Sequence, residues 1–243
     1  LVDKPGYGRR DRRMRLGTSH MPDEKTLPTA PVRVWDLPTR LFHWALVACV
    51  IGLIVSGNVG GNALVWHMRL GLLVGALLLF RIVWGLVGGR WSRFASFIYA
   101  PATVLRYVRG QARTGDQFDV GHNPLGSFSV FGLLGLLALQ VASGSMADDE
   151  IATTGPLNRF VSSATASLAT GWHKGLGKAL VVALVLLHVA AIVYYLRRKK
   201  QNLITPMLTG DKVLPAGTPA STDNLVARGL AGVLFAACAA LAV

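Results

Sequence analysis

Cysteine is scarce in this sequence of 243 residues, and so is the chemistry that depends on it. The two cysteines, Cys49 and Cys238, lie in separate apolar runs and have no partner at the spacing of a disulfide or a thiolate metal site. The sequence therefore favours neither a disulfide-stabilised domain nor a cysteine-bound metal ion.

Acidic residues are also few. The chain has 12 Asp and Glu against 25 Lys and Arg, which gives a formal net charge of +13, while 52% of its residues are hydrophobic. A soluble globular domain rarely combines these values. The basic residues alternate with apolar runs and form no separate basic domain, so nucleic acid is not an expected partner. The composition predicts a membrane protein surrounded by a lipid bilayer.

Long apolar runs are abundant. A helix needs about 20 residues to cross about 30 Å of hydrocarbon. The first run is short, and its helix is expected to begin earlier, with Asp36 as the N-cap and Pro38 in the first turn. The five candidate spans are residues 41–57, 66–87, 125–146, 173–196 and 225–243.

The distribution of basic residues predicts the orientation, because Lys and Arg concentrate in loops that stay in the cytoplasm. The connection 58–65 has no basic residue, and the connection 147–171 holds three acidic residues but only Arg159 as a basic one. We therefore predict a cytoplasmic N-terminus. The basic residues of the three segments assigned to the inside are Arg9, Arg10, Arg12, Arg13, Arg15, Arg33 and Arg40; Arg90, Arg93, Arg106, Arg109 and Arg113; and Arg197, Arg198, Lys199 and Lys200.

The chain divides into four parts by composition. Residues 1–30 are polar and rich in charge, which predicts a disordered basic tail. Residues 31–200 contain the first four spans, and 225–243 form the fifth. Prolines and glycines in 201–224 predict an irregular cytoplasmic linker. Residues 101–113 begin with proline and carry an apolar stripe, which predicts a short helix on the inner surface.

Five of the six histidines lie inside a span or at its first turn. An ionisable residue in a membrane helix is costly unless it is paired or bound. With the N-terminus inside, His67 and His173 come near the outer surface, and His43 and His188 near the inner one. At 1.5 Å per residue, the two histidines of the fourth span are about 22 Å apart. The depths predict two pairs, His67 with His173 and His43 with His188.

A metal centre with two imidazoles and no carboxylate or thiolate favours haem. Zinc and non-haem iron usually take three or four protein ligands, whereas haem iron needs only two axial ones. No Cys-x-x-Cys-His motif is present, so each haem is expected to be non-covalent haem b. Glycines in the spans would let a flat macrocycle approach, although ordinary helix packing explains most of them equally well. These glycines are Gly52, Gly71, Gly75, Gly132, Gly135, Gly175 and Gly177.

Four further residues are candidates for cofactor contacts. Arg81 falls near the depth of His188, where a propionate of the inner haem or the headgroups would supply an anion. Arg69 and Lys174 adjoin the outer pair and are candidates for the outer propionates, with snorkelling to headgroups as the alternative. His122, in "GHNP", either starts a helix capped by Asn123 or takes part in the inner haem or quinone site.

Four segments together resemble the bacterial cytochrome b561 and nickel–iron hydrogenase b-type cytochrome family. They are "LPTRLFHWALVACVIGLIVSG", "WHMRLGLLVGALLLFRIVWGLVG", "GHNPLGSFSVFGLLGLLALQVASG" and "WHKGLGKALVVALVLLHVAAIVYY". The resemblance covers about residues 31–200. It implies an all-α membrane protein in which a four-helix bundle binds two b haems, with the pairing that depth predicts. The hydrogenase-linked branch also has a fifth C-terminal transmembrane helix.

Two filled axial positions leave no site for oxygen on the iron, which favours one-electron transfer. We expect a cytochrome of the bacterial inner membrane that relays electrons between a periplasmic redox subunit and the quinone pool. The subunit would be hydrogenase-like, a dehydrogenase or a c-type cytochrome. A stand-alone superoxide:quinone oxidoreductase is an alternative that the acidic 147–171 connection argues mildly against. A haem-free membrane anchor or proton-relay bundle is another.

Overall fold

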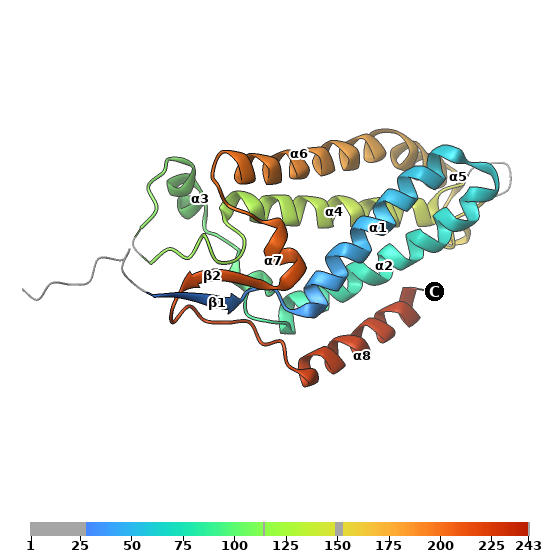
Figure 1. Ribbon diagram of the computed structural model, residues 1–243. Helices are drawn as coiled ribbons and strands as arrows, with labels where there is room; N and C mark the ends of the chain where they lie inside the picture. Colours follow the sequence, from blue (N-terminus) through green and yellow to red (C-terminus); the bar gives the residue numbers. More distant parts are fainter. Residues whose placement is uncertain (1–27, 114, 149–152, 243) are drawn as a thin grey trace, which may run out of the picture.

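The computed structural model describes residues 28–113, 115–148 and 153–242 (Figure 1). Most of these residues are helical, and five long helices form the body of the molecule. The helices are α1 (Leu37–Val59), α2 (Leu64–Val87), α3 (Pro101–Val108), α4 (Pro124–Met146), α5 (Ser163–Trp172), α6 (Lys178–Arg197), α7 (Ile204–Thr209) and α8 (Leu225–Ala242). The strands are β1 (Thr29–Arg33) and β2 (Asp211–Pro215). Short 3-10 turns occupy Gly61–Ala63, Phe94–Ser96 and Asn158–Phe160, and a π-helical turn, His173–Gly177, joins α5 to α6.

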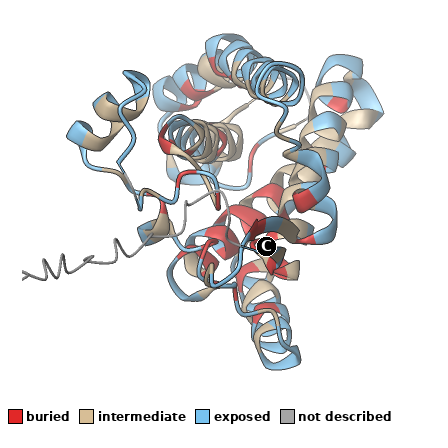
Figure 2. Cartoon of the chain, turned by 60° about the vertical axis from the view of Figure 1, so that its left-hand side comes forward, coloured by how far each residue is buried: buried red, intermediate tan, exposed pale blue. Residues whose placement is uncertain are grey.

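The prediction of five membrane spans is confirmed in length and composition. Each of the five helical stretches is long and apolar enough to cross a bilayer. The fourth stretch begins earlier than predicted, because α5, the π turn and α6 continue one another over Ser163–Arg197. Buried residues make up 44% of the most apolar window of the second stretch, Gly61–Val87, but only 6% of that of the fourth stretch. The outward helix faces are accordingly exposed (Figure 2), as expected for surfaces that meet hydrocarbon.

Helix starts follow the predicted capping. Asp36 accepts a hydrogen bond from the backbone nitrogen of Thr39 at 2.8 Å, with Pro38 in the first turn of α1. Asn123 accepts one from the backbone nitrogen of Gly126 at 2.8 Å at the start of α4. Both caps satisfy amide groups that a helix start leaves unpaired.

Helix α2 is the centre of the packing. It runs along α1, α4 and α8, and α4 in turn packs along α6. Leu77, Phe80 and Trp84 of α2 belong to the main core cluster, which Phe42 of α1 and Cys238 of α8 join. Helix α8 lies on the side of α2 away from α6 (Figure 1).

A two-stranded sheet was not predicted. Strands β1 and β2 pair antiparallel, with Thr29 opposite Pro215 and Arg33 opposite Asp211. The prediction of an irregular linker is therefore wrong for α7 and β2, and β1 begins inside the segment assigned to the tail. The reason is long-range pairing: the carbonyl of Gly210 accepts hydrogen bonds from the backbone nitrogens of Val34 and Trp35, at 2.9 and 3.0 Å. The rest of the predicted tail, residues 1–27, lies outside the described residues.

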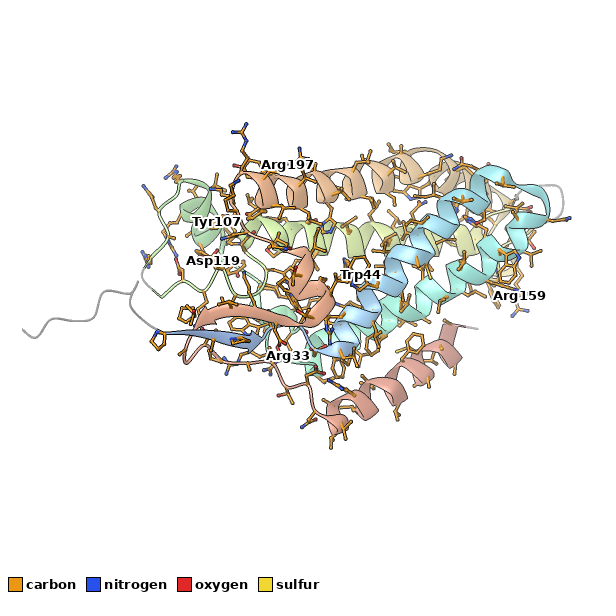
Figure 3. The ribbon with its side chains drawn as sticks, in the orientation of Figure 1. Arg33, Trp44, Tyr107, Asp119, Arg159 and Arg197 are labelled. Carbon is orange, nitrogen blue, oxygen red and sulfur yellow. The ribbon has the colours of Figure 1, made fainter. Side chains whose placement is uncertain are left out.

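The two ends of the bundle differ in charge. We call the end that carries the sheet, α3 and α7 the sheet end, and the end that carries α5 and the turn Asn158–Phe160 the far end. Figure 3 shows Arg33, Asp119 and Arg197 at the sheet end and Arg159 at the opposite one. Most described basic residues lie in segments of the sheet end. They are Arg33, Arg40, Arg90, Arg93, Arg106, Arg109, Arg113, Arg197, Arg198, Lys199, Lys200, Lys212 and Arg228.

Candidate cofactor site

The far-end histidines face each other across the bundle. His67 is the fourth residue of α2, and His173 begins the π turn before α6. Their ring centroids are 5.9 Å apart and their planes are at 89°. Metal–imidazole bonds are about 2 Å long, so two rings that share one metal have centres roughly 6 Å apart. The observed separation fits one metal between the two rings.

Backbone carbonyls of neighbouring helices hold both rings by the nitrogen that a metal would not use. His67 Nδ1 lies 3.1 Å from the carbonyl oxygen of Leu53 on α1. His173 Nδ1 lies 3.0 Å from the carbonyl oxygen of Gln140 on α4. A carbonyl oxygen only accepts, so each Nδ1 carries the proton and each Nε2 keeps its lone pair for a metal.

Two glycines let these imidazoles lie against helix backbones. A Cβ at Gly57 would be 3.0 Å from Cε1 of His67, and a Cβ at Gly144 would be 2.7 Å from Cε1 of His173. Neither glycine was among those selected from the sequence. Three of the selected ones, Gly71, Gly135 and Gly175, have no other described atom within 4 Å of such a Cβ, so they leave open space.

The π turn changes the hydrogen bonding around His173. Gly175 has non-helical φ and ψ of −99° and −109°, which interrupts the regular helix. The side-chain amide nitrogen of Gln140 donates to the carbonyl oxygen of His173 at 3.2 Å, and the backbone carbonyl oxygen of Gln140 accepts from Nδ1 of the His173 ring at 3.0 Å. Gln140 therefore binds His173 at two points. Sequence reasoning missed it, because neither contact follows a sequence periodicity.

The second pair lies toward the sheet end. His43 of α1 is within electrostatic range of His188 of α6. His188 Nδ1 is 3.4 Å from the hydroxyl of Ser129 on α4, whereas the buried His43 Nδ1 has no partner among the described residues. Trp44, next to His43, donates from its ring nitrogen to the carbonyl oxygen of Met207 at 3.1 Å, which attaches α1 to α7 (Figure 3).

The donor set fits haem and not a metal ion held by the protein alone. Among the described residues, no group of three or more His, Cys, Asp and Glu side chains is placed to hold a metal ion. Haem iron takes four nitrogens from its porphyrin and needs only two more ligands. The family model of prokaryotic cytochrome b561 matches residues 34–210 of this chain. The chain belongs to the prokaryotic cytochrome b561 family.

Curated relatives are similar to this cytochrome b561 protein at modest identity. The probable Ni/Fe-hydrogenase 1 B-type cytochrome subunit of Escherichia coli K12 is 26% identical over 137 residues. That match covers 46% of this chain and 57% of the relative, just over half of the relative's length. The probable Ni/Fe-hydrogenase B-type cytochrome subunit of Bradyrhizobium diazoefficiens is 24% identical over 222 residues, 78% of this chain and 89% of the relative. No solved structure matches the chain.

Family membership and the five spans together define the class of the protein. It is a multi-pass bacterial membrane cytochrome b, and its cofactor is haem b. This confirms the family and the kind of cofactor predicted from the sequence.

Arg81 of the cytochrome is buried in α2, and its charge acts on His122. Its side chain is almost inaccessible, with 3% of the residue exposed, and its guanidinium lies 4.6 Å from the ring centre of Phe94. It lies within electrostatic range of Asp36. Its Nη1 is buried and has no hydrogen-bond partner among the described residues. An unsatisfied buried cation of this kind fits an anionic group of a bound cofactor.

Asp36 does more than cap α1. This fully buried carboxylate accepts hydrogen bonds from the Trp84 ring nitrogen at 3.1 Å, the Gly89 backbone nitrogen at 3.2 Å and the Ser92 hydroxyl at 2.6 Å. It therefore joins the start of α1 to the end of α2 and the loop that follows. The sequence predicted only the cap, because the other contacts connect positions about 50 residues apart.

His122 is close enough to His43 and His188 for their charges to act on it. Its ring centroid is 4.7 Å from that of Trp35 and 4.6 Å from that of Phe97, and its carbonyl accepts a hydrogen bond from the Tyr99 hydroxyl at 2.6 Å. Burial, and then the charge of Arg81, lowers the pKa of the His122 imidazole to about 3, so the ring is neutral at pH 7. Its role at a cofactor stays a prediction.

The two basic candidates next to the far-end pair, Arg69 and Lys174, are exposed. The Arg69 guanidinium lies 5.1 Å from the ring centre of Trp66. Lys174 follows His173 and is within electrostatic range of it. Both positions suit contact with propionates or with headgroups, and their roles stay predictions.

Proposed function

We propose that this protein is a di-haem cytochrome that relays electrons between a redox subunit at the far end and quinone in the membrane. His67 and His173 would bind the far-end haem, and His43 and His188 the sheet-end haem. The observation that carries the proposal is the 5.9 Å separation of His67 and His173, each held through Nδ1 by another helix. Loss of haem from single-histidine variants tests it, as argued in the Discussion.

The bound haems would supply the one-electron chemistry, and the residues of the chain would bind and orient the haems. With two imidazoles bound, each iron would have no open coordination position for oxygen. The hydrogen bonds from Nδ1 to Leu53 and Gln140 fix the orientation of the far-end imidazoles and raise their basicity. The apolar helices around the two proposed sites would keep water away from the path between the haems.

Arg81 is proposed to pair with a propionate of the sheet-end haem. Its positive charge favours the reduced iron, which carries one positive charge less. We expect Arg81→Gln to keep both haems and to lower one midpoint potential. At an effective dielectric constant near 20 the effect is on the order of 1 kcal/mol, or roughly 40 mV for one electron.

A redox titration that resolves the two haems checks this expectation. Arg69→Gln is the comparison, because its charge lies at the far end and is expected to act on the other haem. If Arg81→Gln leaves both midpoints unchanged, Arg81 does not pair with a propionate.

The orientation is also a proposal. The basic sheet end suggests that this end and the N-terminus face the cytoplasm. In spheroplasts, protease added from outside is expected to cut within 147–171 and to spare 90–113, and immunoblots of the fragments measure both. Disrupted spheroplasts are the control, in which 90–113 also becomes accessible. Cleavage of 90–113 alone in intact spheroplasts would reverse the assignment.

The redox partner is proposed from the names of the relatives, which are probable hydrogenase cytochrome subunits. We infer a hydrogenase-like subunit that docks at the far end, and quinone as the acceptor. Co-purification of a redox subunit with the tagged cytochrome, followed by quinone-dependent oxidation of the reduced haems, tests both partners.

A further inference from the structure

A groove lies where α2 ends and α8 begins. It has a volume of about 440 Å³ and lies between the last turn of α2, the loop after it, and the residues around the start of α8. Trp84, Val87 and Leu230 line its helical side, whereas Arg90, Arg93 and Thr222 line the side beyond the helix ends. Because α2 and α8 are long and apolar enough to span a membrane, we expect the groove at their ends to lie at the boundary between hydrocarbon and headgroups.

The polar side of the groove is positively charged. Arg90 and Arg93 are exposed, and neither guanidinium forms a hydrogen bond or ion pair with another described residue. Among the residues that the structure describes, none of those lining the groove is acidic. Asp223 follows the groove residue Thr222 in the sequence. Its carboxylate binds Arg33 at 2.7 Å and Arg228 at 3.0 Å, so it does not neutralise Arg90 and Arg93.

The groove is built on a rigid base. Asp36 accepts from the backbone nitrogen of Gly89, and the Ser221 hydroxyl accepts from that of Trp91 at 3.2 Å. The Trp91 ring nitrogen donates to the carbonyl of Pro219 at 2.8 Å. These bonds tie the loop that carries both arginines to the segment before α8.

We propose that this groove binds the phosphate of an anionic phospholipid, with the acyl chains along α2 and α8. Guanidinium groups bind phosphate through two parallel hydrogen bonds. Basic pockets between membrane helices are suited to anionic headgroups. The apolar residues below the arginines favour a lipid over free phosphate, and the two unpaired positive charges favour an anion over a neutral quinone. From the sequence alone, Arg90 and Arg93 predicted only the orientation of the chain in the membrane.

The test is native mass spectrometry of the full haem-loaded protein in detergent with dioleoylphosphatidylglycerol. One tightly retained lipid per chain is expected. Arg90→Gln/Arg93→Gln is expected to lower the ratio of lipid-bound to lipid-free protein about tenfold or more, because each charged hydrogen bond that is lost weakens binding. Arg90→Lys/Arg93→Lys should recover part of the binding, since it keeps charge without the paired geometry.

Three controls decide between the possible sources of binding. Arg109→Gln/Arg113→Gln removes two exposed arginines from the loop after α3 and should leave retention unchanged; an equal loss there would overturn the site, because it shows general charge attraction. Dioleoylphosphatidylcholine should be retained far less, and equal retention would overturn the preference for an anion. Binding of inorganic phosphate without retention of the lipid would overturn the lipid as the ligand. Haem content should stay the same in every variant.

Discussion

Replacing His67 with alanine is expected to remove one of the two proposed haems and to leave the other bound. The ring of His67 faces His173 at 5.9 Å, whereas the second pair lies toward the other end of the bundle. An iron that loses one of its two axial imidazoles loses a main part of its attachment, because these haems have no covalent link. Pyridine haemochrome per mole of protein should fall by about half.

Double variants make the pairing itself testable. His67→Ala/His173→Ala removes two ligands of one proposed site, so it should keep as much haem as either single variant. His67→Ala/His188→Ala removes one ligand from each site and should keep none. Equal haem contents in these two double variants would contradict the pairing, and a single variant that loses all haem would contradict separate sites.

The sequence predicted the features that depend on local chemistry and length. Apolar runs of about 20 residues predicted the spans, because every backbone polar group in hydrocarbon must be paired within the helix. Asp36 and Asn123 predicted helix starts, because a cap acts within three residues. The depth of each residue in the membrane predicted that His67 and His173 lie near each other, because the rise per residue in a helix is nearly constant.

Features that depend on contacts between distant segments could not be predicted in this way. The pairing of β1 with β2 joins residues about 180 positions apart, and the proline and glycine pattern near Gly210 signalled only a break. The contacts of Gln140 with His173 depend on how α4 lies against the π turn. The groove of Arg90 and Arg93 exists only because α8 packs on α2, which no periodicity in either helix specifies.

Substituting valine for Gly144 is expected to remove the far-end haem without touching a ligand. The new Cβ would lie 2.7 Å from Cε1 of His173, and the ring cannot move away without losing its hydrogen bond to Gln140. In a haem-free protein the ring would turn aside at little cost. With iron bound at Nε2 and Gln140 at Nδ1, the ring is held on both sides, so the clash acts on the haem-bound form.

The matched control is Gly232→Val on α8, where a Cβ meets no other described atom within 4 Å. Both changes put a β-branched residue into a long apolar helix, so their intrinsic effect on helix formation is the same. Haem content should fall toward half in Gly144→Val and stay complete in Gly232→Val. The haem that remains in Gly144→Val should have the midpoint potential of the haem retained in His173→Ala, because both variants empty the same site. Two haems with unchanged potentials in Gly144→Val would show that the His173 ring is not held against α4 when haem is bound, and would remove the main support for its assignment as a ligand.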